Sequence, residues 1–435
     1  MFAYQLVISI FGFRKPTKNY KDFDPQLRFL VLVPAHNEEP VIAGIIHNLR
    51  HMEYPKELYD FYILADNCTD RTVDIARQMG ANVIELHKDS EDAPTGKSVV
   101  LRKGLEILEG YQSRYDLVMF FDADNLIDPN MFLEVNSQYL SHEGNVDIIQ
   151  CYLGCKNKTG IVALFYYVSF TIANRFFQCA KTRLGLNSGI GGTGYAISTQ
   201  YLSERGGWTA MSLTEDFELQ VEATCDGKRI LWNHNVRVYD EKPTQVLPSL
   251  RQRTRWAQGL WYVTFQNTRK LFRALLAKRI PFKEFLSTFI CMYSVTSYFV
   301  ITLQVLLNLV ISILRWTSLI SDPLPSFLAG TWFFSTIPGI LLFLYTFVIL
   351  FYIADSMDNK CRVKLHLLPP LCLSVLLNTI LIAWAQVAGL FRHKRQTNWV
   401  KTEHSINCLE ESSRLLSGEV ESNAKIRREP AERPA

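Results

Sequence analysis

The sequence predicts an α/β protein with a mostly parallel sheet, joined to a hydrophobic membrane region near its C-terminus. Short apolar runs alternate with stretches of helical length through the first part of the chain, which is the order of elements in a parallel sheet covered by helices. Residues 286–391 are then dominated by Leu, Ile, Val and Phe. A polar and charged segment, residues 392–435, follows them.

The predicted strands are short apolar runs bounded by turn residues, as expected for strands buried on both faces. They lie at Leu27–Pro34, Phe61–Ala65, Val83–Leu86, Leu117–Phe121 and Asp147–Tyr152. The stretches between them predict helices at Val41–Met52, Thr69–Met79 and Lys97–Leu108. This order places a soluble α/β domain at residues 14–257.

Composition excludes two classes of protein. The net charge of +4, with no stripe of Lys and Arg interleaved with aromatic residues, argues against a nucleic-acid partner. The nine cysteines are scattered, and the nearest pair, Cys151 and Cys155, is not followed by a second pair or a His cluster at zinc spacing. We therefore expect reduced, mostly buried thiols in a domain that faces the cytosol.

Three apolar runs near the C-terminus are each longer than the ~20 residues that cross a bilayer. They are Leu286–Leu314, Phe327–Ile353 and Leu365–Phe391, the last interrupted by Pro369-Pro370, and they predict two or three membrane spans within 286–391. The N-terminal run, residues 1–13, would extend only ~20 Å as a helix. It predicts an interfacial anchor or the end of a longer span, and it lacks the basic start and cleavage site of a signal peptide.

Basic residues predict the orientation in the membrane. Arg14, Lys15, Lys18 and Lys21 follow the N-terminal run, which indicates a cytoplasmic domain. Basic residues also follow the last apolar run, although three spans would leave that end outside. Either one apolar run lies at the interface or the number of spans differs by one. The overall prediction is an integral protein of the plasma membrane.

Residues 258–285 mix Leu, Trp and Phe with Arg and Lys. This pattern is typical of a basic amphipathic helix lying on the inner leaflet, and a soluble surface helix is the alternative. The segment would connect the soluble domain to the membrane spans.

Polar residues follow the predicted strands where each strand ends, and ligands of parallel sheets bind at those ends. The first strand runs into Pro34-Ala35-His36-Asn37-Glu38-Glu39, the second into Asp66, and the fourth into Asp122-Ala123-Asp124. No GxGxxG follows the first strand, which argues against a dinucleotide fold. Two carboxylates in this setting can share Mg²⁺ or Mn²⁺ with phosphate oxygens, although the same triplet also occurs as a turn or helix cap.

Three further motifs add candidate site residues. The pair Glu215 and Asp216 after Thr214 is either an ordinary helix start or a source of a general base. In Gln252-Arg253-Thr254-Arg255-Trp256, arginine suits phosphate and tryptophan suits a sugar ring. The loop Gly191–Gly194 would allow a ligand close to the backbone. Lys97, after Gly96 at a helix start, could meet an anion or remain solvated.

The ordered set DAD, GGTG, TED and QRTRW, followed by membrane helices, resembles glycosyltransferase family 2 over roughly residues 27–400. The resemblance is to the branch with cellulose, hyaluronan, chitin and poly-N-acetylglucosamine synthases, and it implies a GT-A fold and inversion at the anomeric carbon. It implies nucleotide contacts by Ala35, Glu38 and Asp66, with Asp122 and Asp124 as the DxD pair and Asp124 as the more direct metal ligand. It also implies Asp216 as catalytic base, and Gln252, Arg255 and Trp256 at the diphosphate and acceptor end.

The function this predicts is processive transfer from a UDP-sugar to a growing polysaccharide, with a lipid acceptor as the alternative. A subunit that binds without catalysing is a third possibility, which the intact motifs argue against. Ala65 stands where many relatives carry Asp, and the few C-terminal helices leave export, or an accessory subunit for it, open. Residues 399–402 resemble a C-terminal segment of some members, and residues 410–435 predict a disordered tail.

Overall fold

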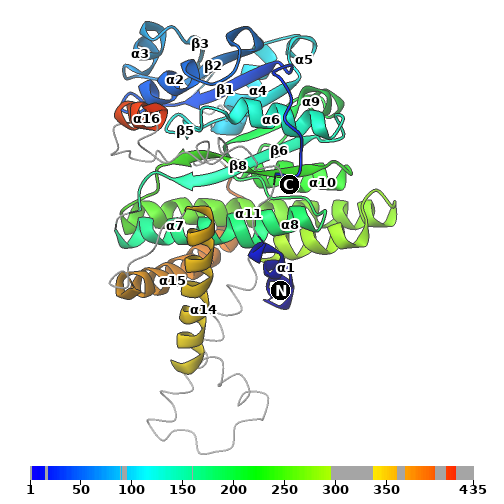
Figure 1. The fold of residues 1–435 in the computed structure, drawn as a ribbon, viewed down its shortest axis with the longest axis vertical. Coiled ribbons are helices and arrows are strands. Elements are labelled where there is room, and N and C mark those ends of the chain that lie inside the picture. The colour runs from blue at the N-terminus through cyan, green and yellow to red at the C-terminus, as the bar shows by residue number, and fades with distance from the viewer. Residues whose placement is uncertain are drawn as a thin grey trace, which may run out of the picture.

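A computed structural model describes residues 2–14, 18–88, 90, 96–158, 160–294, 337–359, 368–396 and 408–417. One open sheet with helices on both faces lies above a layer of long helices, as Figure 1 shows. Most of the first predicted span, the start of the second, residues 399–402 and the end of the tail lie outside the described residues.

The sheet has eight strands in the order β3-β2-β1-β4-β7-β6-β8-β5. They are β1 (Phe29–Ala35), β2 (Tyr59–Asp66), β3 (Asn82–Leu86), β4 (Leu117–Phe120), β5 (Leu126–Ile127), β6 (Ile148–Cys155), β7 (Tyr195–Ser198) and β8 (Ile230–Asp240). The predicted strands are all present, and β1 to β4 pair in parallel. Strand β7 runs antiparallel to β4 and β6, and β5 runs antiparallel to β8, so the sheet is mixed.

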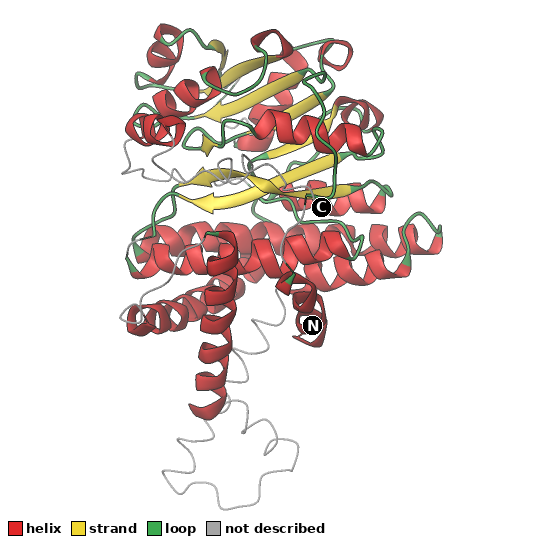
Figure 2. Cartoon of the chain, viewed as in Figure 1, coloured by secondary structure: helices red, strands yellow, loops and turns green. Residues whose placement is uncertain are grey.

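Helices cover both faces of the sheet, so its central strands are buried on both sides (Figure 2). Along β1, Phe29, Val31 and Val33 face one core, whereas Leu30 and Leu32 face the other. The first core is closed by α2 (Ile42–Arg50), α3 (Thr72–Gln78) and α6 (Met131–Ser141). The second is closed by α4 (Lys97–Ile107), α5 (Tyr111–Arg114), α9 (Thr199–Glu204) and α10 (Glu215–Cys225).

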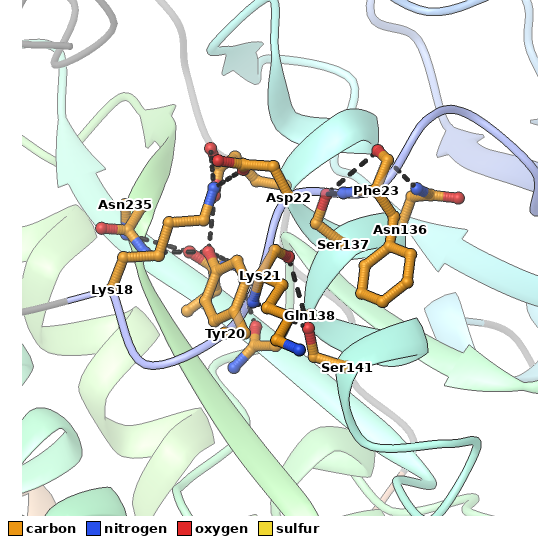
Figure 3. Close-up of polar contacts among 12 residues, drawn as sticks. Lys18, Tyr20, Lys21, Asp22, Phe23, Asn136, Ser137, Gln138, Ser141 and Asn235 are labelled. Atoms are coloured by element: carbon orange, nitrogen blue, oxygen red, sulfur yellow. Dashed lines mark hydrogen bonds and ion pairs between the residues drawn. The ribbon is translucent and has the colours of Figure 1, made fainter. Parts of the chain in front are cut away.

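The segment before β1 is tied along α6 by side chains of that helix (Figure 3). The backbone N–H of Lys21 donates to Ser141 Oγ at 2.9 Å, and that of Phe23 donates to Ser137 Oγ at 3.1 Å. The Tyr20 hydroxyl donates to Glu134 Oε2 at 2.6 Å. The bonds of Lys21 and Phe23 satisfy backbone N–H groups that have no strand partner. They lead the chain from the N-terminal helix α1 (Phe2–Ile10) and the turn η1 (Phe11–Phe13) into the sheet.

A layer of long helices underlies the sheet (Figure 1). It contains α7 (Ile161–Ala173), the π-helical turn η3 (Asn174–Cys179), α8 (Ala180–Arg183) and α11 (Val246–Leu276). The QRTRW motif and most of the predicted interfacial segment therefore lie on one continuous helix, α11, of 31 residues. Helix α15 (Leu368–Arg392) packs against α11 and α7.

Among the described residues, one helix, Leu368–Arg392, is long and apolar enough to cross a membrane, and Tyr4–Phe13 is a shorter apolar helix. Pro369 and Pro370 do not break α15, because they occupy its first turn, where backbone N–H groups have no partner inside the helix. One side of α15, including Val375, is buried, whereas Ile380 and Trp384 on the other side are exposed.

Buried polar contacts attach helix α14 (Ile337–Asp358) to the sheet domain. Arg175 of η3 forms an ion pair with Asp358, and both side chains are fully buried. His234 of β8 lies 3.1 Å from the same carboxylate, and Arg237 donates to the Asp358 carbonyl at 2.7 Å. Buried charges need such partners, so this end of α14 has a defined position against β8.

Candidate active site

The eleven predicted site residues line one cavity of 460 Å³ at the carboxyl ends of β1, β2 and β4. They come from strand ends, from the starts of α4 and α10, and from α11. They are Ala35, Glu38, Asp66, Lys97, Asp122, Asp124, Glu215, Asp216, Gln252, Arg255 and Trp256. The geometry brings together motifs that are up to 221 positions apart, from Ala35 to Trp256, while the individual roles remain predictions.

The loops after β1 and β2 hold each other where they line this cavity. Asn37 Oδ1 accepts the backbone N–H of Thr69 at 2.7 Å, and the backbone N–H of Glu38 donates to Thr72 Oγ1 at 2.8 Å. Asn67 donates to Asp66 Oδ1 at 2.6 Å. The two polar loops follow neighbouring strands, and these hydrogen bonds fix them to each other so that they form one wall of the cavity.

Lys97 lies among the carboxylates and is not a solvated side chain. Its Nζ donates to Asp122 Oδ1 at 2.5 Å and to the Gly192 carbonyl at 2.6 Å, and it lies 3.8 Å from Glu215. Burial by itself would lower the pKa of Lys97, but the charges of Asp122 and Glu215 outweigh it and raise that pKa. A charged lysine at this point suits an anionic ligand.

Asp122 and Asp124 form the acidic loop after β4. Asp124 is 8% exposed, and its two carboxylate oxygens accept from the Glu241 backbone N–H at 2.9 Å and from Asn125 Nδ2 at 3.2 Å. The Asp122 side chain is 42% exposed at the cavity. The described residues contain no group of three His, Cys, Asp or Glu that could hold a metal ion. Two hard oxygen donors fit Mg²⁺ or Mn²⁺ when phosphate oxygens complete the shell.

Glu215 and Asp216 begin α10, as predicted, and Thr214 does not cap that helix with its side chain. Burial, with the neighbouring charge of Asp216, raises the pKa of Glu215 to about 7, although Lys97 opposes the shift. Burial also raises the pKa of Asp216, against the Phe217 backbone N–H that donates to Oδ1 at 2.8 Å. Carboxylates with raised pKa values in a cavity are typical of acid–base sites.

Gln252, Arg255 and Trp256 share one face of α11 because they are three and four positions apart. The Tyr166 hydroxyl donates to Gln252 Oε1 at 2.9 Å, and the Tyr166 ring packs edge-on against Trp256, with centroids 6.1 Å apart. Burial lowers the pKa of Arg255, and its Nε has no hydrogen-bond partner among the described residues. A buried donor of this kind is suited to an anion that enters the cavity.

The sequence alone did not single out several residues that shape the site. Gly259 is one, because a Cβ at that position would lie 2.3 Å from Thr214 Oγ1 and 2.8 Å from the Thr214 backbone nitrogen. Glycine there lets α11 lie directly against the start of α10. Tyr166 is another such residue, because it contacts both Gln252 and Trp256. Gln396 is a third, because it lines the cavity and its Oε1 accepts from the Leu213 backbone N–H at 2.8 Å. These contacts join distant segments, so no local pattern signals them.

A family model described as "Glycosyltransferase like family 2" matches residues 25–259, more than half of the chain. The chain belongs to glycosyltransferase family 2. This family 2 glycosyltransferase is 30% identical over 251 residues to the beta-monoglucosyldiacylglycerol synthase of Nostoc sp., covering 57% of this chain and 52% of that protein. It is 22% identical over 250 residues to the poly-beta-1,6-N-acetyl-D-glucosamine synthase of Staphylococcus aureus, covering 58% of each. The chain spans about half the length of the curated relatives it matches.

The solved structure of a mannosyltransferase from Pyrobaculum calidifontis, in complex with GDP-Man and Mn²⁺, superposes with a TM-score of 0.51. The alignment covers 91% of this chain and 96% of that one at 13% identity. This likeness confirms the GT-A type of open sheet predicted for this family 2 glycosyltransferase.

Replacing Lys97 by Met in this family 2 glycosyltransferase is expected to move the acid limb of its activity to higher pH. The charge of Lys97 lowers the pKa of both Glu215 and Asp216, so its loss should raise both. A carboxylate base is active only above its pKa. The rate at acid pH should therefore fall more than the rate at alkaline pH, in kcat/KM profiles of both proteins. An unshifted profile with a uniformly lower rate would assign Lys97 to donor binding alone.

Proposed function

We propose that this enzyme transfers a sugar, with inversion, from a UDP-sugar to a hydroxyl group presented at the cytoplasmic surface of a membrane. The observation that carries the proposal is the single cavity lined by the acidic loop, the carboxylates of α10 and the arginine of α11. A donor diphosphate needs cations, and an acceptor hydroxyl needs a base. The cavity holds both kinds of group.

On the donor side, Ala35, Glu38 and Asp66 would receive the nucleotide, because they lie at the ends of β1 and β2. Lys97 and Arg255 would contact the diphosphate, since both are partly buried cations that line the cavity. Asp122 and Asp124 would hold Mg²⁺ or Mn²⁺ together with the phosphate oxygens, and the bound ion would offset the charge of the departing diphosphate.

On the acceptor side, Asp216 would take the proton from the attacking hydroxyl. The oxygen then bonds to the anomeric carbon on the face opposite the leaving diphosphate, so the configuration inverts. The Glu215 carboxylate interacts electrostatically with both Lys97 and Asp216. It would therefore help to set the pKa of Asp216 in the range where that residue can act as a base. Trp256 offers an apolar face to a sugar ring, and Tyr166 holds that indole edge-on.

The helical layer below the sheet would face the bilayer. Most exposed large apolar side chains of the described residues come from α1, α11 with the segment after it, and α15. Those of α11 and the following segment are Val246, Leu247, Phe265, Phe272, Leu276, Phe282 and Leu286. Apolar surface of this extent marks an interaction with a membrane or another protein. Residues 1–13 and 286–391 would anchor the catalytic domain, residues 14–257, with α15 at the interface.

The acceptor we favour is a lipid hydroxyl. Gln252 and Trp256 lie at the cavity on the same helix that exposes Phe265 and Phe272 further along, so an acceptor could enter from the bilayer side. The relative at 30% identity is a glycolipid synthase by name. Extension of a polysaccharide is the second candidate, supported by the QRTRW motif and by the match to a poly-N-acetylglucosamine synthase.

The test uses the full chain in vesicles with UDP-glucose or UDP-N-acetylglucosamine and Mn²⁺. We expect mass spectrometry of the lipid extract to show one added hexose or N-acetylhexosamine, absent with the Asp216→Asn variant. A water-soluble or insoluble product that lengthens with time would favour the polysaccharide instead. Donor binding without any product from either acceptor would identify a binding subunit and contradict the proposal.

A further inference from the structure

The helix α16 (Cys408–Ser417), near the end of the chain, packs on the catalytic domain beside the acidic loop. It contacts α2 and β5, as Figure 1 shows. Cys408 and Ser412 are fully buried in this contact, and Leu415 is 3% exposed. His47 Nδ1 lies 3.0 Å from Ser412 Oγ. The contact is therefore a packed interface and not a loose association of a tail with the surface.

Gly44 of α2 makes this contact possible. A Cβ at position 44 would lie 2.5 Å from Cys408 Cβ and 2.7 Å from the Cys408 carbonyl carbon and oxygen. Any larger residue would force α16 away, because backbone atoms cannot yield as a flexible side chain can. Glycine in a helix normally costs stability, so its presence in α2 has a local reason in this close approach.

Lys156 connects α16 to the acidic loop. It follows β6, and its Nζ donates to the backbone carbonyl of Asp124 and to Cys408 Sγ, the latter at 3.0 Å. Cys408 Sγ itself points to the Asp124 carbonyl at 3.8 Å. On the other side of the loop, the backbone N–H of Ile127 donates to Asn48 Oδ1 of α2. The loop is thus held between α2, Lys156 and α16.

We propose that Lys156, supported by α16, is a positioning residue that fixes the Asp124 backbone so that the Asp124 carboxylate can bind the metal. The proposal rests on the proposed function, in which Asp124 is a metal ligand. The Asp124 carboxylate is buried and directed by the Glu241 N–H, so a shift of its backbone would move it relative to Asp122. Mutation of a residue that orients a metal ligand typically lowers metal affinity or activity by about 10–100-fold.

The experiment measures Mn²⁺ binding in the presence of UDP by electron paramagnetic resonance of free Mn²⁺, using the full chain. Lys156→Met is expected to raise the dissociation constant of Mn²⁺ about tenfold or more. Lys158→Met is the matched control, because Lys158 is two positions away and exposed, and its ammonium group packs over the Tyr167 ring, 4.5 Å from the ring centroid. Lys156→Arg, which keeps a cationic donor, should recover part of the affinity.

The role of α16 is tested by Gly44→Ala, which should weaken Mn²⁺ binding through the displacement of Cys408. If both changes act through the Asp124 backbone, the double variant Lys156→Met with Gly44→Ala should lose less Mn²⁺ affinity than the sum of the two single losses, each measured as a change in log Kd.

A thermal melt of each variant shows whether the whole domain is still folded. A folded Lys156→Met protein with unchanged Mn²⁺ affinity would overturn the proposal, and additive effects would overturn the link to α16. If the unmodified chain binds no Mn²⁺ with UDP, the proposed function itself fails.

Discussion

Asp216→Asn is expected to slow sugar transfer by about 10²–10⁴-fold while donor binding is retained. The amide has nearly the shape of the carboxylate and can still accept from the Phe217 N–H, but it cannot take a proton from the acceptor. Initial rates with saturating donor, together with the dissociation constant of the UDP-sugar, measure the two effects separately.

The same substitution is not expected to lower thermal stability. Burial raises the pKa of Asp216, which means that the folded protein disfavours the charged form at this position. Asp226→Asn, at the other end of α10, is the matched control and should retain transfer activity. Unchanged turnover in Asp216→Asn would move the base assignment to Glu215 or to a group outside the described residues.

Asp124→Asn is expected to remove metal-dependent donor binding and to lower turnover by on the order of 10³-fold. The metal ion would supply several kcal/mol of stabilisation to the departing diphosphate, and about 4 kcal/mol corresponds to that factor. The amide can still accept from the Glu241 N–H, so the fold of the loop should persist. Titration of Mn²⁺ with UDP, followed by rate measurements across Mn²⁺ concentrations, checks the prediction.

Asp128→Asn provides the control for that loop, four residues further on. Asp128 is buried beside Arg237, and burial raises its pKa to about 6. Its carboxylate accepts from the Arg237 backbone N–H at 2.9 Å, and Asp128 is not among the residues that line the cavity. We expect this variant to change thermal stability and to leave Mn²⁺ affinity within about twofold of the original, since it removes no metal ligand. Equal loss of Mn²⁺ binding in both variants would show that the loop, and not Asp124, is the sensitive feature.

The sequence predicted the elements that depend on local pattern. Strands such as Phe29–Ala35 are continuous apolar runs, which the sequence shows directly. The polar residues after each run lie at the end of the strand even when the predicted bounds differ from the observed ones by one or two residues. It did not predict β5, β7 or β8. Strands β5 and β7 are so short that they exist only through their pairing with β4, β6 and β8. Strand β8 has the polar run Asn233-His234-Asn235 in its middle and is therefore not a continuous apolar run. The antiparallel direction of β7 likewise depends on where the preceding helical layer returns the chain to the sheet.

The environment of Lys97 shows the same limit. From the sequence, a lysine at a helix start was equally consistent with a solvated side chain and with an anion contact. In the fold its side chain is 16% exposed and contacts Asp122, Glu215 and the Gly192 carbonyl, three partners from distant segments. The domain boundary predicted at residue 257 was also placed inside a continuous element, because α11 contains both the QRTRW motif and the apolar stretch after it.

By itself, the sequence determined the strands β1 to β4 with the helices between them, the family and the identity of the candidate site residues, because each depends on residues close together in the chain. The tertiary structure alone decided that these motifs meet in one cavity, that burial raises the pKa values of Glu215 and Asp216, and that α16 lies behind Asp124. The physical reason is that burial and charge interactions depend on distance in space, and Gly44 and Gly259 control those distances only when the helices opposite them are in place.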